Sequence, residues 1–159
     1  SSENRIQKHI AIEILLNMII GKSSNLYQEL YEKGSLLAQP DLDYEFTEQY
    51  AHILISGFSK EPKLIKQKMD ETIRKMKENG LNPEHFNRIK KKIYGDYVVE
   101  YNSVAETARM FLADSMKQIN SFDYIEDFET VTKEYAEEIL KDILKEENEI
   151  LSIVNPNEN

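Results

Sequence analysis

The segment from residue 10 to residue 20 constrains the fold most, because it is apolar at every position except Glu13 and Asn17. A helix that crosses a bilayer needs about twenty apolar residues, so this segment is too short to span one. No small-residue cleavage site follows it, which argues against a signal peptide. We therefore predict a core helix over residues 6–20 that is covered on more than one side. Gly21 would end it as a left-handed cap.

The hydrophobic period changes further along the chain. A second, short helix is predicted over residues 26–31, with capping side chains before it and a stop at Gly34. Residues 42–46 then alternate between apolar and polar, which is typical of a strand with one dry and one wet face. Residues 51–57 are apolar on both faces, so we place this strand deeper in the sheet and pair the two as an antiparallel hairpin.

Helical periodicity returns after Pro62 and continues through most of the remaining chain. Three starts carry capping signals: Asn82 before Pro83, Ser103 with Glu106, and Thr132. We predict helices over residues 64–79, 83–101, 103–116, 124–128 and 132–144, and a last strand over residues 149–154. The fold class is therefore α+β, with a small antiparallel sheet of three strands and helices packed on one face. Residues 1–159 are expected to form a single domain.

Charge and cysteine content exclude several classes of function. The net charge is −9, which disfavours binding to nucleic acid or to anionic lipid. The densest basic run, residues 90–92 beside Arg88, is interpreted as a solvated helix face. The chain has no cysteine, so disulfides, thiolate metal sites and cysteine nucleophiles are excluded. This content is compatible with a reducing compartment, and we expect a cytoplasmic location.

The three histidines do not form a recognisable metal motif. His9 and Glu13 share a helix face but supply two ligands at most. His52 is expected to be partly buried in a strand, and His85 to be exposed in the first turn of a helix. Neither H-x-x-E-H nor H-E-x-x-H occurs. We predict no metal site in this chain.

Other catalytic arrangements are equally poorly supported. There is no G-x-S-x-G elbow, and the scattered glycines build no phosphate-binding loop. The acidic side chains of residues 41, 43 and 45 follow the spacing of a solvated strand face. Tyr94, Tyr97 and Tyr101 recur along one helix, which favours a packing stripe over a binding surface. We predict no catalytic residue.

Four parts of the sequence resemble a known family. They lie in order along nearly the whole chain: the run from Ala11 to Leu30, Ile55-Ser56-Gly57 before the loop to Pro62, Ser103-Val104-Ala105-Glu106, and Phe122-Asp123-Tyr124 ahead of Thr132. Together they resemble the C-terminal half of the pitrilysin and mitochondrial-processing-peptidase family of zinc metallopeptidases, in particular its bacterial, processing-peptidase-like members.

The resemblance implies a division of labour between two homologous halves. In that family the halves close over a peptide, and the N-terminal half holds the zinc. The C-terminal half lacks the motif and helps to hold the substrate. An Arg and a Tyr of active members contact the peptide backbone; their positions fall here at Tyr31 and Ala38, which both depart from the pattern. The resemblance thus implies substrate-facing positions at these two residues and a zinc ion only in the other half.

Three interpretations remain open. The first is a non-catalytic C-terminal half of a zinc-dependent endopeptidase, helping to enclose and align peptides. The second is a proteolytically inactive binding or heterodimerisation module of the same fold, which the departures at Tyr31 and Ala38 favour. The third is an unrelated α+β domain. Under the first two, the chain is an excised part of a longer protein that lacks its first strand or strands, and its partner is the N-terminal half or a sister subunit. An exposed sheet edge could also pair with a second copy.

Overall fold

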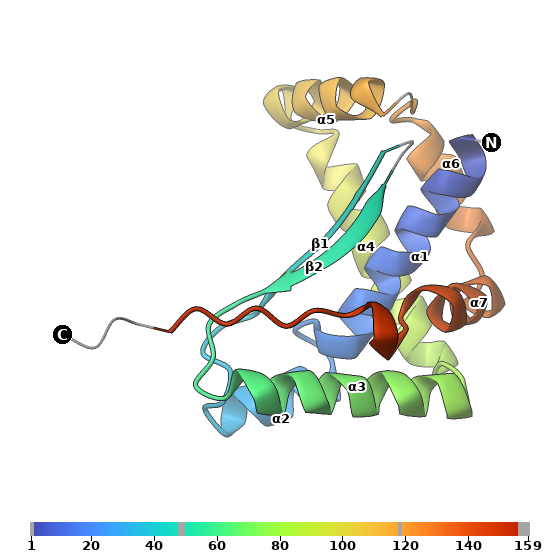
Figure 1. Ribbon diagram of the computed structural model, residues 1–159. Coiled ribbons are helices and arrows are strands. Elements are labelled where there is room, and N and C mark those ends of the chain that lie inside the picture. Colours follow the sequence, from blue (N-terminus) through green and yellow to red (C-terminus); the bar gives the residue numbers. More distant parts are fainter. Residues whose placement is uncertain (1, 48–49, 118, 156–159) are drawn as a thin grey trace.

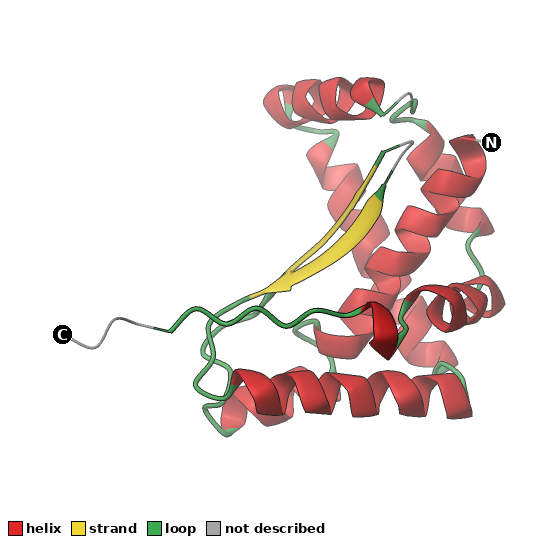
Figure 2. Ribbon diagram, viewed as in Figure 1, coloured by secondary structure: helices red, strands yellow, loops and turns green. Residues whose placement is uncertain are grey.

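The computed structural model describes residues 2–47, 50–117 and 119–155 (Figure 1). Helices dominate these residues, and the strands form one hairpin (Figure 2). In chain order the elements are α1 (Ser2–Ile20), α2 (Asn25–Glu32), β1 (Asp41–Phe46), β2 (Ala51–Ser56), α3 (Pro62–Asn79), α4 (Pro83–Glu100), α5 (Val104–Met116), α6 (Asp123–Thr130), α7 (Lys133–Ile143) and the 3₁₀ turn η1 (Glu146–Asn148). The predicted α+β class, with helices against one face of a small antiparallel sheet, is confirmed.

Helix α1 is the centre of the core, as its apolar sequence predicts. It packs against α2, α3, α4, α6, α7 and β1. Ile10, Ile14 and Ile20 are fully buried. Burying one such side chain stabilises a fold by roughly 1.5–3 kcal/mol, so α1 supplies much of the driving force for folding.

Local capping chemistry fixes where the helices begin. Four N-cap side chains each accept a hydrogen bond from a backbone N–H three residues on: Ser24 from Tyr27, Asn82 from His85, Ser103 from Glu106, and Thr132 from Tyr135. A cap of this kind is worth about 1 kcal/mol. Gly34 and Gly80 have φ values of 71° and 77°, which favour glycine.

Gly21 was predicted to end the first helix by adopting a left-handed backbone conformation, and this reason is wrong. Helix α1 does end at Ile20, but Gly21 is not among the glycines with positive φ. A Cβ atom at this position would lie 2.4 Å from the carbonyl oxygen of Asn17. The close approach of the helix backbone therefore requires glycine here.

Strands β1 and β2 pair antiparallel, with Tyr44 opposite Ile53 and Leu42 opposite Ile55. Tyr44 and Phe46 are buried on the side of the helices, whereas Asp41, Asp43 and Glu45 face solvent. The predicted dry and wet faces of β1 are thus confirmed.

The prediction that β2 lies deeper than β1 is wrong. Its burial is lower, and Leu54 is 52% exposed. The helices cover one face of the hairpin, so apolar residues on the other face of β2 stay in contact with water.

The predicted third strand over residues 149–154 is also not observed. This segment leaves η1 without strand pairing to any described residue (Figure 2). Ile150 and Val154 are 94% and 93% exposed, while Leu151 and Ile153 are less so. Within the part of the chain that the structure describes, no strand pairs with this segment.

Candidate functional site

The two positions implied by the resemblance lie near each other in sequence at the α2–β1 connection. Tyr31 is in the last turn of α2 and is 53% exposed. Ala38 lies in the loop that leads to β1 and is also exposed. Leu37 and Phe58 are exposed as well, and the Leu37 N–H donates to the Phe58 carbonyl at 3.1 Å. We call Tyr31, Leu37, Ala38 and Phe58 the α2–β1 surface.

The α2–β1 surface rests on a fixed backbone. Leu36 forms an antiparallel bridge with Ser59, which extends the hairpin beyond its regular strands. The buried Ser35 hydroxyl donates to Glu61 at 2.5 Å, and its carbonyl accepts from the Ser59 hydroxyl at 2.9 Å. The Lys60 N–H donates to the same carbonyl. These contacts hold the two loops together beneath the exposed side chains.

Tyr31 has contacts of its own within α2. Its ring stacks on Tyr27, with ring centroids 5.6 Å apart. Beside it, Glu29 accepts from Lys33 at 2.7 Å and from Lys68 at 3.1 Å. These hydrogen bonds lower the pKa of Glu29, with attraction from the two ammonium groups adding to the effect. The side chains around Tyr31 are thus an ordered aromatic pair beside a cluster of mixed charge.

Sequence reasoning missed the exposed apolar members of this surface. Phe58 is 77% exposed. It lies between Gly57 and Ser59, and an isolated aromatic residue in such a polar turn could have indicated an exposed side chain. The sequence does not distinguish Leu37 from its apolar neighbour Leu36, although Leu36 is buried and Leu37 is exposed.

The histidines are spread over the fold rather than gathered. His9 is half-buried beside β1 and α6. His52, predicted to be partly buried, is exposed on the uncovered face of β2. His85, predicted to be exposed, is half-buried, and its Nε2 atom has no hydrogen-bond partner in the described structure. Burial, with a smaller effect of Arg88, lowers the pKa of His85. Across residues 2–47, 50–117 and 119–155, no three His, Cys, Asp or Glu side chains lie together as a metal site would require.

The tyrosine stripe on α4 is a packing stripe, as predicted. Tyr97 stacks on Tyr124 and meets Phe128 edge-on, at 5.4 and 5.3 Å between ring centroids. Tyr94 also meets Phe128, and Tyr101 stacks on Phe122. The stripe joins α4 to α6.

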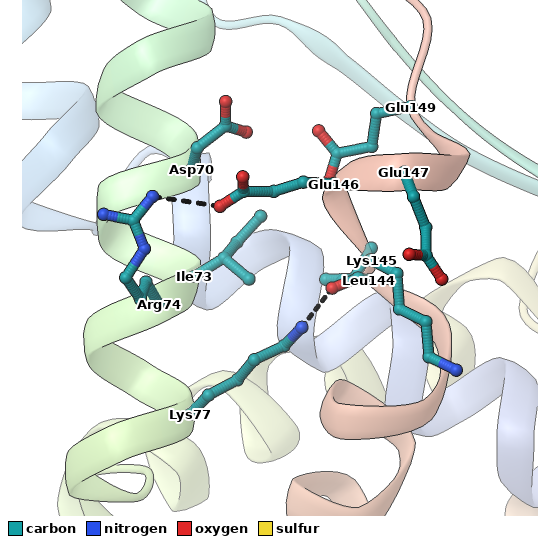
Figure 3. Close-up of a pocket in the computed structure, with 9 residues that line it drawn as sticks. All are labelled: Asp70, Ile73, Arg74, Lys77, Leu144, Lys145, Glu146, Glu147 and Glu149. Carbon is teal, nitrogen blue, oxygen red and sulfur yellow. Dashed lines mark hydrogen bonds and ion pairs between the residues drawn. The ribbon is translucent and has the colours of Figure 1, made fainter.

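A pocket of about 330 Å³ lies between α3 and the chain after α7 (Figure 3). Most of its charged side chains have an ion-pair or hydrogen-bond partner. Arg74 pairs with Glu146 at 3.0 Å, and the Lys77 ammonium donates to the Leu144 carbonyl. Lys66, next to the pocket, bridges Asp70 and Glu149. This arrangement ties the C-terminal segment to α3 and shows no pair of carboxylates set apart for acid–base chemistry.

The fold and the site together define a class: an α+β half-domain with an ordered surface beside its hairpin and no metal-binding cluster among the residues described. The family "Peptidase M16 inactive domain" matches residues 2–93, more than half of the chain. The chain belongs to this family. The resemblance to the C-terminal half of the pitrilysin-like metallopeptidases is thereby confirmed.

Two relatives agree with this assignment. An uncharacterized zinc protease of Bacillus subtilis (strain 168), YmfH, is 24% identical over 139 residues, which are 86% of this chain and 32% of the relative. The crystal structure of an M16-like peptidase from Alicyclobacillus acidocaldarius superposes with a TM-score of 0.81 at 23% identity. The superposed region is 87% of this chain and 34% of the chain in that crystal structure. The chain thus spans about a third of the length of either relative.

One further finding concerns membranes. None of the helices in the part of the chain described here is long and apolar enough to cross a bilayer.

Proposed function

We propose that the chain is the non-catalytic C-terminal half of a zinc-dependent endopeptidase-like protein and that it helps to enclose and align peptide substrates. Membership of the inactive-domain family supports this proposal, as does the partial match to a relative described as a zinc protease. The observation that carries it is the α2–β1 surface. There, exposed apolar side chains stand on a backbone fixed by the Leu36–Ser59 bridge.

Such a surface would act by positioning. Holding a peptide in one orientation reduces the entropy that must be lost before its scissile bond reacts. Tyr31 and Phe58 would contact apolar side chains of the peptide, and an ordered loop loses little entropy on binding. A zinc ion would belong to the N-terminal half, where it would activate the attacking water.

The test is peptide hydrolysis by the parent protein with Tyr31 changed to Ala. Loss of one aromatic contact is expected to lower kcat/KM about fivefold, mainly through KM, which corresponds to about 1 kcal/mol. Tyr50→Ala is the matched control, since Tyr50 is 59% exposed but lies outside the α2–β1 surface. Equal effects of the two substitutions on kcat/KM would contradict the proposal.

The second candidate is a proteolytically inactive module that binds peptides or pairs with a sister subunit. The absence of the family's Arg and Tyr at Tyr31 and Ala38 favours it. The double substitution Tyr31→Arg with Ala38→Tyr restores the family pattern. If the parent is a peptidase, this variant should retain or increase peptide cleavage. If the parent carries no H-x-x-E-H motif and cleaves no peptide in either form, the module is the correct interpretation.

A further inference from the structure

Helix α5 is attached to the rest of the molecule by polar side chains on one of its sides. The Thr107 hydroxyl donates to the Tyr101 carbonyl at 3.2 Å, and the buried Asp114 accepts from the Ser121 hydroxyl at 2.6 Å. The Tyr101 hydroxyl donates to the Ser121 carbonyl at 2.5 Å, which ties the end of α4 to the same place. None of the main packing contacts among the described elements involves α5, and Figure 1 shows it at one end of the molecule. The polar contacts therefore leave the other side of α5 toward solvent.

The outward side of α5 is apolar. Four residues at intervals of four form one row along the helix: Val104, Ala108, Leu112 and Met116. All four are exposed, and the exposed fractions of Val104, Leu112 and Met116 are 88%, 67% and 81%. A helix on the surface of a folded domain normally turns its apolar side to the core, and α5 does the reverse. We call these four residues the α5 row.

Aromatic rings hold α5 in place beside the row. Phe111 meets Phe122 edge-on, with 5.2 Å between ring centroids, and Phe122 stacks on Tyr101 at 5.8 Å. Phe122 is itself 56% exposed, so it extends the apolar surface from α5 to the start of α6. An ordered, contiguous apolar surface of this kind is typical of a site that contacts another protein surface.

The spacing of the α5 row fits a second helix. Side chains four residues apart form a ridge, and such ridges pack into the grooves between the corresponding ridges of another helix. Ala108 is small and lies within the row, so it leaves a gap that a larger side chain of the partner can fill. The partner surface is therefore expected to be helical and apolar.

Charge argues against a second copy of this chain as the partner. Arg109, the one basic residue of α5, is already paired with Glu106 at 3.3 Å. The like charge of Glu106 also acts on Glu100 at the end of α4, and Asp123 directly follows Phe122. Two copies that met at α5 would bring two such acidic borders together, in chains that each carry a net charge of −9. A helix with basic residues at its edges has the complementary charge.

The size of the surface leads to the same conclusion. Helix α5 has 13 residues, so the α5 row is about 20 Å long, and a strip about 10 Å wide offers on the order of 200 Å². Proteins that associate freely in solution bury about 800 Å² on each partner. A smaller contact suffices when both surfaces belong to one polypeptide, because the tether raises their effective concentration to about the millimolar range. This chain spans about a third of the length of either relative, so much of each relative lies outside the matched part.

We propose that the α5 row docks a helix of the same polypeptide from outside residues 1–159, and that this helix has an apolar face with basic residues at its edges. This rests on the proposed function in one respect, that the chain is part of a longer parent protein. It adds the place at which the parent packs on this chain and the chemistry of the surface that it presents there.

Hydrogen exchange of the parent protein and of the 159-residue chain, followed by mass spectrometry under the same conditions, tests this docking. A packed helix slows the opening of the helix that it covers, so protection of residues 104–116 is expected to be about tenfold higher in the parent. Residues 133–143 of α7, which already pack on α1, should change much less. The 159-residue chain should remain a monomer at micromolar concentrations in analytical ultracentrifugation.

Two variants of the parent assign the difference. Leu112→Glu places a charge within the α5 row and should reduce the protection of residues 104–116 to that of the 159-residue chain. Leu54→Glu, at a 52% exposed position on the open face of β2, is the matched control and should leave this protection unchanged. If the parent with Leu112→Glu does not fold, Met116→Gln provides a milder form of the same test.

Equal protection of α5 in the parent and in the 159-residue chain would overturn the proposal, as would a difference that survives the substitutions in the α5 row. A dimer of the 159-residue chain that dissociates on Leu112→Glu would also overturn it, because the partner would then be a second copy. A parent that protects α5 but cleaves no peptide would contradict the proposed function and still support the docking at α5.

Discussion

His9 is the residue whose surroundings most clearly control its chemistry. Its Nδ1 atom forms a 2.9 Å hydrogen bond with the Tyr124 hydroxyl, and its ring stacks on Tyr44 at 5.6 Å. Lys117 lies over the neighbouring ring of Phe46, 5.0 Å from its centroid. Burial first, and then repulsion from Lys117, lower the pKa of His9 to about 4. The imidazole is therefore a neutral packing group between α1, β1 and α6.

This neutral imidazole predicts acid lability. The unfolded chain takes up the His9 proton near pH 6.5, but the folded chain does so only near pH 4. Stability from this residue is complete above pH 6.5 and is lost as pH falls through 4, by at most about 3 kcal/mol. His9→Phe should remove this part of the acid dependence while costing about 1 kcal/mol at pH 7, because the Tyr124 hydroxyl loses its partner.

Urea unfolding between pH 7 and pH 4 measures this difference. His52→Phe, on the uncovered face of β2, is the control and should leave the acid dependence unchanged. An acid profile that is the same for His9→Phe and the unmodified chain would show that His9 does not titrate as described.

At the scale of the element, the sequence predicted those features that depend on neighbouring residues in the chain, such as helix caps. The caps at Ser24, Asn82, Ser103 and Thr132 form as expected, because each involves a side chain and a backbone group three residues away. Exposure of the second strand and of His52 could not be predicted, since it depends on which sheet face the distant helices cover. The strand expected at residues 149–154 failed for the same reason, because pairing requires a partner that sequence periodicity does not reveal.

The candidate site at Tyr31 and Ala38 stays a prediction, and it came only from the resemblance. No pattern in the sequence marks Tyr31 or Ala38 as functional, because an exposed tyrosine in a helix and an alanine in a loop are ordinary. Phe58 joins them only through the Leu36–Ser59 bridge, which links positions more than twenty residues apart.

Lys66 links two elements and makes a testable contribution to stability. Its ammonium group lies 2.6 Å from Asp70 and 2.5 Å from Glu149, and all three side chains are largely shielded from water. Lys66→Met should therefore lower the free energy of unfolding by about 1–2 kcal/mol, since it leaves two carboxylates close together without a cation. Lys33→Met, which breaks an exposed pair with Glu29, should cost less than about 0.5 kcal/mol.

Urea denaturation of both lysine variants at neutral pH provides the comparison. Equal losses of unfolding free energy would mean that the contact between α3 and the C-terminal segment contributes no more than a surface ion pair.

At the scale of the whole molecule, the structure is organised around α1. The helices bury α1 and leave one face of a two-stranded sheet open. The chain belongs to the M16 inactive-domain family and spans about a third of the length of both relatives. The proposed role is therefore to help enclose peptides, with the peptide-facing surface formed by Tyr31, Leu37, Ala38 and Phe58.

The most direct measurement is a chelator-controlled zinc titration of the 159-residue chain, with bound metal determined by mass spectrometry under native conditions. Our account predicts no stoichiometric zinc, because His9, His52 and His85 lie apart and do not gather carboxylates around them. One tightly held equivalent of zinc, lost when any of these histidines is replaced, would contradict the assignment of this chain as the half without a metal.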